Sequence, residues 1–145
     1  MKSLSTTKLL TALRKSNDID QFLKDNCCDL NNPTLSAHLK QLLDAHGLKP
    51  TDLSNAALLD RSFTYQLING TRIPNRNILL RFSFVLHLSL QEVQNLLRIS
   101  QKGELYPRVL RDTLLIYAIE QNLSLLDAND LLLQYNQSPL LFEEY

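Results

Sequence analysis

The sequence predicts an all-α protein, and three observations lead to this prediction. Leucine and other apolar residues recur at intervals of three and four along most of the 145 residues, which is the spacing of one helix face. Only three glycines and five prolines interrupt the pattern. The Asn69-Gly70 pair lies between two helical patterns rather than between the alternating apolar residues of a β-hairpin. With 44 % hydrophobic residues, the chain can bury a core of ordinary size.

The first 32 residues predict a short helical extension. Residues 4–15 and 18–23 each carry apolar residues at helical spacing, and Asp18 is placed to cap the second helix. The run Asp29-Leu30-Asn31-Asn32-Pro33 is rich in turn-forming residues and makes the clearest break in the chain. We therefore predict a boundary at this run, with the extension covering residues 1–32.

Five helical segments follow over residues 33–101, and most have a recognisable start or stop. They run from Thr34 to His46, from Pro50 onward, from Arg61 to Ile68, from Asn75 or Asn77 through Leu86, and from Ser89 through Ile99. Gly47 and Gly70 are placed as C-terminal stops, and Asp60 is placed as an N-cap. Ser89 and Glu92 have the spacing of a capping box.

Residues 102–145 predict a helical hairpin, with helices over residues 108–121 and 124–135. This hairpin is similar to the one before it, because Leu88–Leu97 matches Leu123–Leu132 and Leu79-Leu80 matches Leu114-Leu115 at the same offset. Two similar hairpins are too few to define a solenoid. The apolar residues of the second hairpin exceed one stripe, so we expect part of it to cover the preceding domain and part to form a dimer seam.

Charge is distributed unevenly along the chain, although fifteen basic and fifteen acidic residues give a net charge of zero. The stretch from Arg61 to Gln91 holds four arginines and no acidic residue. Its arginines are Arg61, Arg72, Arg76 and Arg81. This distribution favours one phosphate-facing surface, with acidic surroundings that limit non-specific binding. Because Arg81 lies within an apolar run, we expect it to partner a carboxylate rather than DNA.

The segment from Thr51 to Arg76 has the pattern of a helix-turn-helix. Such a unit needs two helices locked by apolar inner faces, with the outer face of the second helix free to reach base edges. The predicted inner-face residues are Leu53, Ala57, Leu59 and Leu67. The residues predicted to read bases are Arg61, Ser62, Tyr65, Gln66 and Asn69. The residues predicted to hold phosphates are Thr51, Thr71, Arg72, Asn75 and Arg76. Arginine can bridge the O6 and N7 atoms of guanine, and glutamine the N6 and N7 atoms of adenine, so this surface suits double-stranded DNA.

At these residues the chain resembles the lambda-repressor-like (Cro/repressor, often called XRE) helix-turn-helix family. The matching residues are Leu53-Ser54-Asn55-Ala56-Ala57 in the first helix and Asp60-Arg61-Ser62-Phe63-Thr64-Tyr65-Gln66-Leu67-Ile68-Asn69-Gly70-Thr71-Arg72-Ile73-Pro74 in the second helix and its exit. The apolar helix after them and the start Leu88-Ser89-Leu90-x-Glu92 extend the match over about residues 35–100. The resemblance implies a five-helix domain and a transcriptional regulator, often a homodimer on palindromic DNA. Residues 104–112, with the final helix and the N-terminal residues, resemble one subfamily of uncharacterised bacterial regulators, which implies no further activity.

Three residues depart from the family pattern. Leu58 stands where family members usually carry a turn glycine, and a left-handed leucine costs about 1–2 kcal/mol, so we expect this turn to be rearranged. Ile68 replaces the usual glutamate before Asn-Gly, and Thr64 stands where an aliphatic residue normally packs. These departures bear on the register in which bases are read more than on the fold.

The sequence gives no pattern typical of an enzyme, a cofactor site or a metal site. His38, His46 and His87 are far apart and lack metal-ligand spacing, and neither a glycine-flanked nucleophile nor a phosphate-binding glycine-rich loop occurs. The adjacent Cys27 and Cys28 predict two reduced thiols. No apolar run is long enough to span a membrane, and the N-terminus has no secretory pattern, so we expect a cytoplasmic protein.

A protein-interaction adaptor is the alternative function. Helix-turn-helix folds can serve as adaptors without binding DNA, and a net charge of zero is compatible with that role. Its partner would dock on the N-terminal or C-terminal helices. Substitutions of Arg61 and Gln66 separate the two functions, because only DNA binding depends on these side chains.

Overall fold

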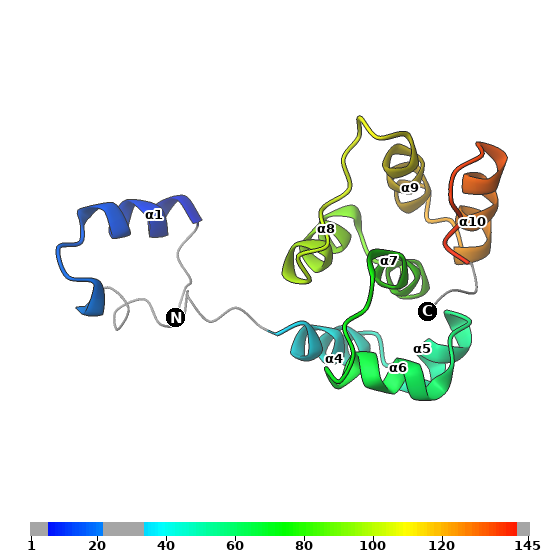
Figure 1. Ribbon diagram of the computed structural model, residues 1–145, viewed down its shortest axis with the longest axis horizontal. Helices are drawn as coiled ribbons and strands as arrows, with labels where there is room; N and C mark the ends of the chain where they lie inside the picture. The colour runs from blue at the N-terminus through cyan, green and yellow to red at the C-terminus, as the bar shows by residue number, and fades with distance from the viewer. Residues whose placement is uncertain (1–5, 22–33, 142–145) are drawn as a thin grey trace. The chain divides into compact units, whose positions relative to one another are not determined.

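The computed structural model describes residues 6–21 and 34–141 (Figure 1). Over these residues the chain forms helices, turns and bends and no strand, so the all-α prediction is confirmed. The chain divides into an N-terminal unit, residues 1–33, and a main unit, residues 34–145. The division directly follows Pro33, and residues 102–141 belong to the same unit as residues 34–101. None of the described helices is long and apolar enough to cross a membrane.

The N-terminal unit contains one complete described helix, α1 (Thr6–Lys15). A helical turn begins at residue 19, and the Asp18 carboxylate accepts a hydrogen bond from the Asp20 amide at 3.0 Å, as its predicted capping role requires. The rest of the predicted second helix, together with Cys27 and Cys28, lies outside the described residues.

The main unit begins with five helices whose bounds agree closely with the predicted segments. They are α4 (Leu35–Ala45), α5 (Pro50–Ala56), α6 (Arg61–Ile68), α7 (Arg76–Val85) and α8 (Leu90–Ile99). Side-chain caps explain most of the starts, because Thr34, Asp60, Asn75 and Ser89 each accept a hydrogen bond from an amide three residues later. The sequence left Asn75 and Asn77 as alternatives, and Asn75 is the cap.

The helices of the main unit also end alike, with one residue in the left-handed conformation after each C-cap. These residues are Gly47, Leu58, Gly70, His87, Gln101, Asn122 and Asn136. At most of these ends, the amide of the following residue donates a hydrogen bond to a carbonyl oxygen in the last turn of the helix. An example is the bond from the Leu59 amide to the Ser54 carbonyl, at 2.9 Å. The sequence places leucine at this next position after four helices, and the apolar side chain turns the chain back toward the core.

Helix α7 is the centre of the main unit and packs against α5, α8 and α10 (Figure 1). Leu79, Leu80 and Phe82 on this helix are completely buried. Arg81 is also buried, and its guanidinium donates hydrogen bonds to the carbonyl oxygens of Leu140 at 2.8 Å and Ala57 at 3.4 Å. It therefore joins the C-terminal segment to the end of α5 from inside the core.

The predicted C-terminal hairpin is present as α9 (Leu110–Glu120) and α10 (Leu125–Gln134). It repeats α7–α8 at an offset of 35 residues, and α8 contacts α9 as α7 contacts α10. The contacts between the hairpins are reciprocal. Arg76 binds Asp112, while Arg111, the counterpart of Arg76, binds Asn77, the counterpart of Asp112. The two hairpins thus pack about a local pseudo-two-fold axis.

Candidate nucleic-acid interface

The orientation of α6 is fixed by its start and by its inner face. The Asp60 carboxylate accepts a hydrogen bond from the Phe63 amide at 3.0 Å, which defines the first turn. Thr64, Leu67 and Ile68 are buried, so this side of the helix faces the core. One face of α6 is therefore committed to packing, and the opposite face is free.

The predicted inner faces of α5 and α6 are confirmed. Leu53, Ala57, Leu59 and Leu67 are all buried, and α5 packs directly against α6. The two helices are joined by the four residues from Ala57 to Asp60. This short connection and its buried flanks fix the angle between the helices.

The turn between α5 and α6 corrects one prediction. Leu58 has φ 58°, so it adopts the left-handed conformation, and the expected rearrangement of the turn is wrong. The side chain is 57 % exposed and contributes little burial in exchange for the strain. The burial of Ala57 and Leu59 on either side, with the hydrogen bond from the Leu59 amide, holds the residue in this conformation.

Thr64, another departure from the family pattern, is accommodated without an unsatisfied polar group. Its side chain is completely buried, and its hydroxyl donates a hydrogen bond to the Asp60 carbonyl one turn earlier, at 2.9 Å. The hydroxyl therefore fits where the family has an aliphatic side chain. At the third departure, Ile68 packs its side chain into the core, and its carbonyl accepts a hydrogen bond from the Ser36 hydroxyl at 2.6 Å.

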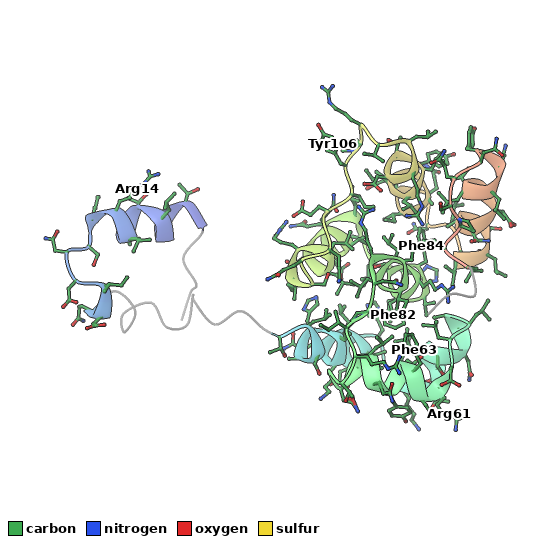
Figure 2. The ribbon with its side chains drawn as sticks, in the orientation of Figure 1. Arg14, Arg61, Phe63, Phe82, Phe84 and Tyr106 are labelled. Carbon is green, nitrogen blue, oxygen red and sulfur yellow. The ribbon has the colours of Figure 1, made fainter. Side chains whose placement is uncertain are left out.

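The predicted base-reading residues share the outer face of α6. Arg61, Ser62, Tyr65 and Asn69 are exposed, and Gln66 is half-buried. Figure 2 shows the Arg61 side chain projecting away from the body of the main unit. The face therefore presents a guanidinium, a hydroxyl, a phenol and two amides, which together can donate and accept hydrogen bonds at base edges.

The loop after α6 places a second cation beside this face. The Arg72 guanidinium stacks over the Phe63 ring, 5.5 Å from its centre, and the Arg72 amide donates a hydrogen bond to the Gln66 carbonyl at 3.1 Å. Arg72 and Thr71 are both exposed. Stacking restricts the guanidinium while leaving its N–H groups available to an anion.

The remaining predicted phosphate ligands lie at helix starts. Asn75 is exposed and caps α7 by accepting a hydrogen bond from the Ile78 amide at 2.9 Å. Thr51 is half-buried in the first turn of α5, next to the exposed Lys49. Backbone amides at the start of α7 can bind phosphate oxygens. The start of α5 is less suited to this, because Pro50 has no N–H group and the Lys49 amide donates its hydrogen bond to the Asp52 carboxylate.

Arg76 has a structural role that the sequence did not predict. Its guanidinium forms a bidentate pair with Asp112, at 2.9 and 3.0 Å, and donates further hydrogen bonds to the carbonyl oxygens of Gly103 and Glu104. We had expected Arg76 to hold a phosphate, but four hydrogen bonds direct its donors into the protein.

The Arg76–Asp112 pair perturbs the titration of the carboxylate. Burial raises the pKa of Asp112, but the hydrogen bonds from Arg76 and the Tyr106 amide, with the charges of Arg76 and Arg111, outweigh it. The net result is a pKa below the ordinary value, so Asp112 is ionised and fully paired.

Only two of the four arginines in the acid-free stretch are therefore free to face a nucleic acid. Arg61 and Arg72 are exposed, whereas Arg76 is paired and Arg81 is buried. The positive charge of the candidate interface is concentrated on α6 and the loop that follows it.

Three residues that support this interface were not identified from the sequence. Ser36 fixes the end of α6 from α4, Phe63 positions Arg72, and Asp112 withdraws Arg76 from the surface. For Asp112, the sequence did contain a signal. The repeat aligns Arg76-Asn77 with Arg111-Asp112, and a pseudo-symmetric pair of hairpins brings such equivalent residues together.

The described residues contain no group of three histidine, cysteine, aspartate or glutamate side chains able to hold a metal ion. No family model, no curated protein and no solved structure matches the chain. The arrangement of side chains on α6 and its flanking turns therefore supplies the argument for function.

Proposed function

We propose that residues 34–101 form a lambda-repressor-like helix-turn-helix domain that binds specific double-stranded DNA and regulates transcription. One observation carries the proposal. Helix α6 buries one face in the core and presents Arg61, Tyr65, Gln66 and Asn69 on the other, with arginines at its start and in the loop after its end. A helix held in this way fits the major groove of B-DNA.

In the proposed complex, the outer face of α6 reads base edges. Arg61 suits guanine and Gln66 suits adenine, because each can form two hydrogen bonds to one base. Asn69, Ser62 and Tyr65 lie along the same face and would add further contacts.

Phosphate contacts would fix the register of α6 in the groove. Arg72 and Thr71 supply side-chain donors, and the amides at the start of α7, beside Asn75, supply backbone donors. Arg76 has no part in the proposed contact, because its donors are used within the protein. Such a regulator would act in the cytoplasm, where bacterial DNA lies.

The proposal is tested by selecting duplexes from a random-sequence DNA library with the purified full chain. We expect a defined sequence to be enriched and to bind the wild type in the presence of excess random competitor. Arg61→Ala and Gln66→Ala should each lower affinity for that sequence by at least about tenfold, because each removes a bidentate base contact. Both variants should keep the unfolding temperature of the wild type, since neither side chain belongs to the core.

Matched substitutions on α8 and the segment after it provide the control. Lys102→Ala and Gln91→Ala remove one positive charge and one amide from exposed positions away from α6, and we expect no change in affinity. Failure to enrich any sequence, with no DNA binding at low salt, would contradict the regulator and favour the adaptor. Equal losses for the α6 and control variants would contradict the assignment of α6 as the reading helix.

A further inference from the structure

The second hairpin exposes more apolar surface along α9 than packing within one chain explains. Tyr106, Val109, Leu110 and Tyr117 are between 48 % and 55 % exposed. Leu110, Leu114 and Tyr117 follow the three-and-four spacing of one helix face, and the segment with Tyr106 leads into the same helix (Figure 2). We call the residues Tyr106, Val109, Leu110, Leu114 and Tyr117 the α9 stripe.

The internal repeat shows what this face does in the first hairpin. Helix α7 packs against α5, and its residues Ile78 and Phe82 are buried. Their counterparts in α9 are Thr113 and Tyr117, and both are exposed. The main contacts of α9 are with α8 and α10, so α9 lacks the third layer that covers α7.

The residue differences between the two hairpins indicate that the exposed face of α9 is covered only when a partner binds. Val85 and the C-cap Leu86 at the end of α7 correspond to Glu120 and the C-cap Gln121 at the end of α9, so the second copy carries polar groups at the edge of the face. Tyrosine replaces phenylalanine at its centre. An apolar stripe with tyrosines and a polar rim is typical of protein interfaces that form from folded partners.

We propose that the α9 stripe is the site at which a second copy of this chain docks, with the two α9 helices antiparallel about a two-fold axis near Leu114. In this arrangement Leu110 of one copy lies opposite Tyr117 of the other, and the stripe is self-complementary. The equivalent face of α7 cannot offer the same pairing, because α5 of the same chain already packs against it.

Charge at the ends of the stripe favours this pairing over another partner. Arg108 lies just before α9 and Glu120 is its last residue, and both are exposed. Among the described residues, neither side chain forms an ion pair or a hydrogen bond within its own chain. An antiparallel pair about Leu114 places Arg108 of each copy opposite Glu120 of the other, which gives two symmetric ion pairs.

Sedimentation velocity of the full chain over a range of concentrations tests the proposal. We expect a reversible monomer–dimer equilibrium. Tyr117→Glu should raise the dimer dissociation constant by at least about tenfold, because it places a charge against the apolar Leu110 of the other copy. Leu126→Glu is the control, since Leu126 is 59 % exposed on α10 and lies outside the α9 stripe. Circular dichroism checks that both variants keep their helices.

A charge exchange tests the antiparallel arrangement itself. Arg108→Glu and Glu120→Arg should each weaken the dimer, and the double variant should restore it, because the exchange re-forms both ion pairs. A chain that stays monomeric at all concentrations would overturn the proposal, as would a dimer disrupted by Leu126→Glu and insensitive to Tyr117→Glu. Additive losses in the double variant would overturn the antiparallel pairing.

The proposed dimer through the α9 stripe does not depend on DNA binding. A monomeric Tyr117→Glu variant that still binds a single half-site would leave the proposed function intact. A dimer that binds no DNA would leave the α9 stripe intact.

Discussion

Leu58 shows how a single residue can retain a turn that its own conformational preference disfavours. The left-handed conformation brings the β-carbon close to the following carbonyl and costs about 1–2 kcal/mol. The cost is borne because Ala57 and Leu59 are buried on either side, and a different turn would expose them. The backbone preference of leucine predicted a rearranged turn, but the packing of Ala57 and Leu59 keeps Leu58 in the left-handed conformation.

We expect Leu58→Gly to stabilise the protein by about 0.5–1 kcal/mol, the relief of strain minus the larger backbone entropy of glycine in the unfolded chain. In a domain of this size such a gain raises Tm by roughly 2–6 °C in thermal unfolding followed by circular dichroism. Leu58→Ala is the control, because alanine keeps the β-carbon and the strain. A Leu58→Gly variant less stable than Leu58→Ala would contradict this prediction, because it would show that the backbone entropy of glycine outweighs the strain of the left-handed conformation.

At the scale of the element, the sequence predicted the helices of the main unit and the two faces of α6. Capping residues and the 3.6-residue period act within a few positions along the chain, so Asp60, Ser89 and the buried face of α6 could be read directly. The stacking of Arg72 on Phe63 was not predicted, since it depends on the path of the loop after α6.

We expect Arg72→Ala to weaken DNA binding about equally for specific and random sequences, because a phosphate contact carries no sequence information. The slope of log affinity against log salt should fall by about 0.9, the contribution of one phosphate contact. Fluorescence anisotropy with a labelled duplex at several salt concentrations measures both effects. Lys102→Ala should leave the slope unchanged. A selective loss for the specific sequence would instead assign Arg72 to base reading.

At the scale of the whole molecule, the two hairpins are joined by groups far apart in the sequence. Arg76 and Asp112 are 36 residues apart, and Arg111 and Asn77 are 34 apart. The repeat was visible in the sequence, but the reciprocal contacts were not predicted, because they depend on the way in which the two copies pack. For the same reason, the sequence separated Arg81 from the exposed arginines of the acid-free stretch, but it could not show that Arg76 is also paired within the protein.

We expect Asp112→Ala to destabilise the main unit by about 2–3 kcal/mol, because it leaves the half-buried Arg76 without its carboxylate. Urea unfolding measures the loss. Glu104→Ala removes the carboxylate of the exposed Arg98–Glu104 pair, and we expect little change. Similar losses for the two variants would show that the Arg76–Asp112 contact has no special part in joining the hairpins.

The same pair predicts a dependence of stability on acid. Because Arg76, the Tyr106 amide and Arg111 hold the pKa of Asp112 below its ordinary value of 3.8, the unfolded chain takes up this proton first as pH falls. The contribution of Asp112 is therefore fully present above that value and is lost as pH falls through the pKa of the folded state. Urea unfolding between about pH 5 and pH 2 should show a smaller loss of stability in Asp112→Asn than in the wild type. If the free energy of unfolding falls equally with pH in the two proteins, Asp112 is not the source of the acid sensitivity.

The central claim, that the outer face of α6 contacts DNA bases, is tested most directly by photocrosslinking. Tyr65 on α6 and Tyr117 on α9 are comparably exposed, at 44 % and 55 %. Each is replaced in turn by p-benzoylphenylalanine, and the full chain is irradiated with a random-sequence duplex library at low salt. We predict a protein–DNA adduct from position 65 that salt abolishes, and none from position 117. Adducts from position 117 alone, or from neither position, would contradict the account.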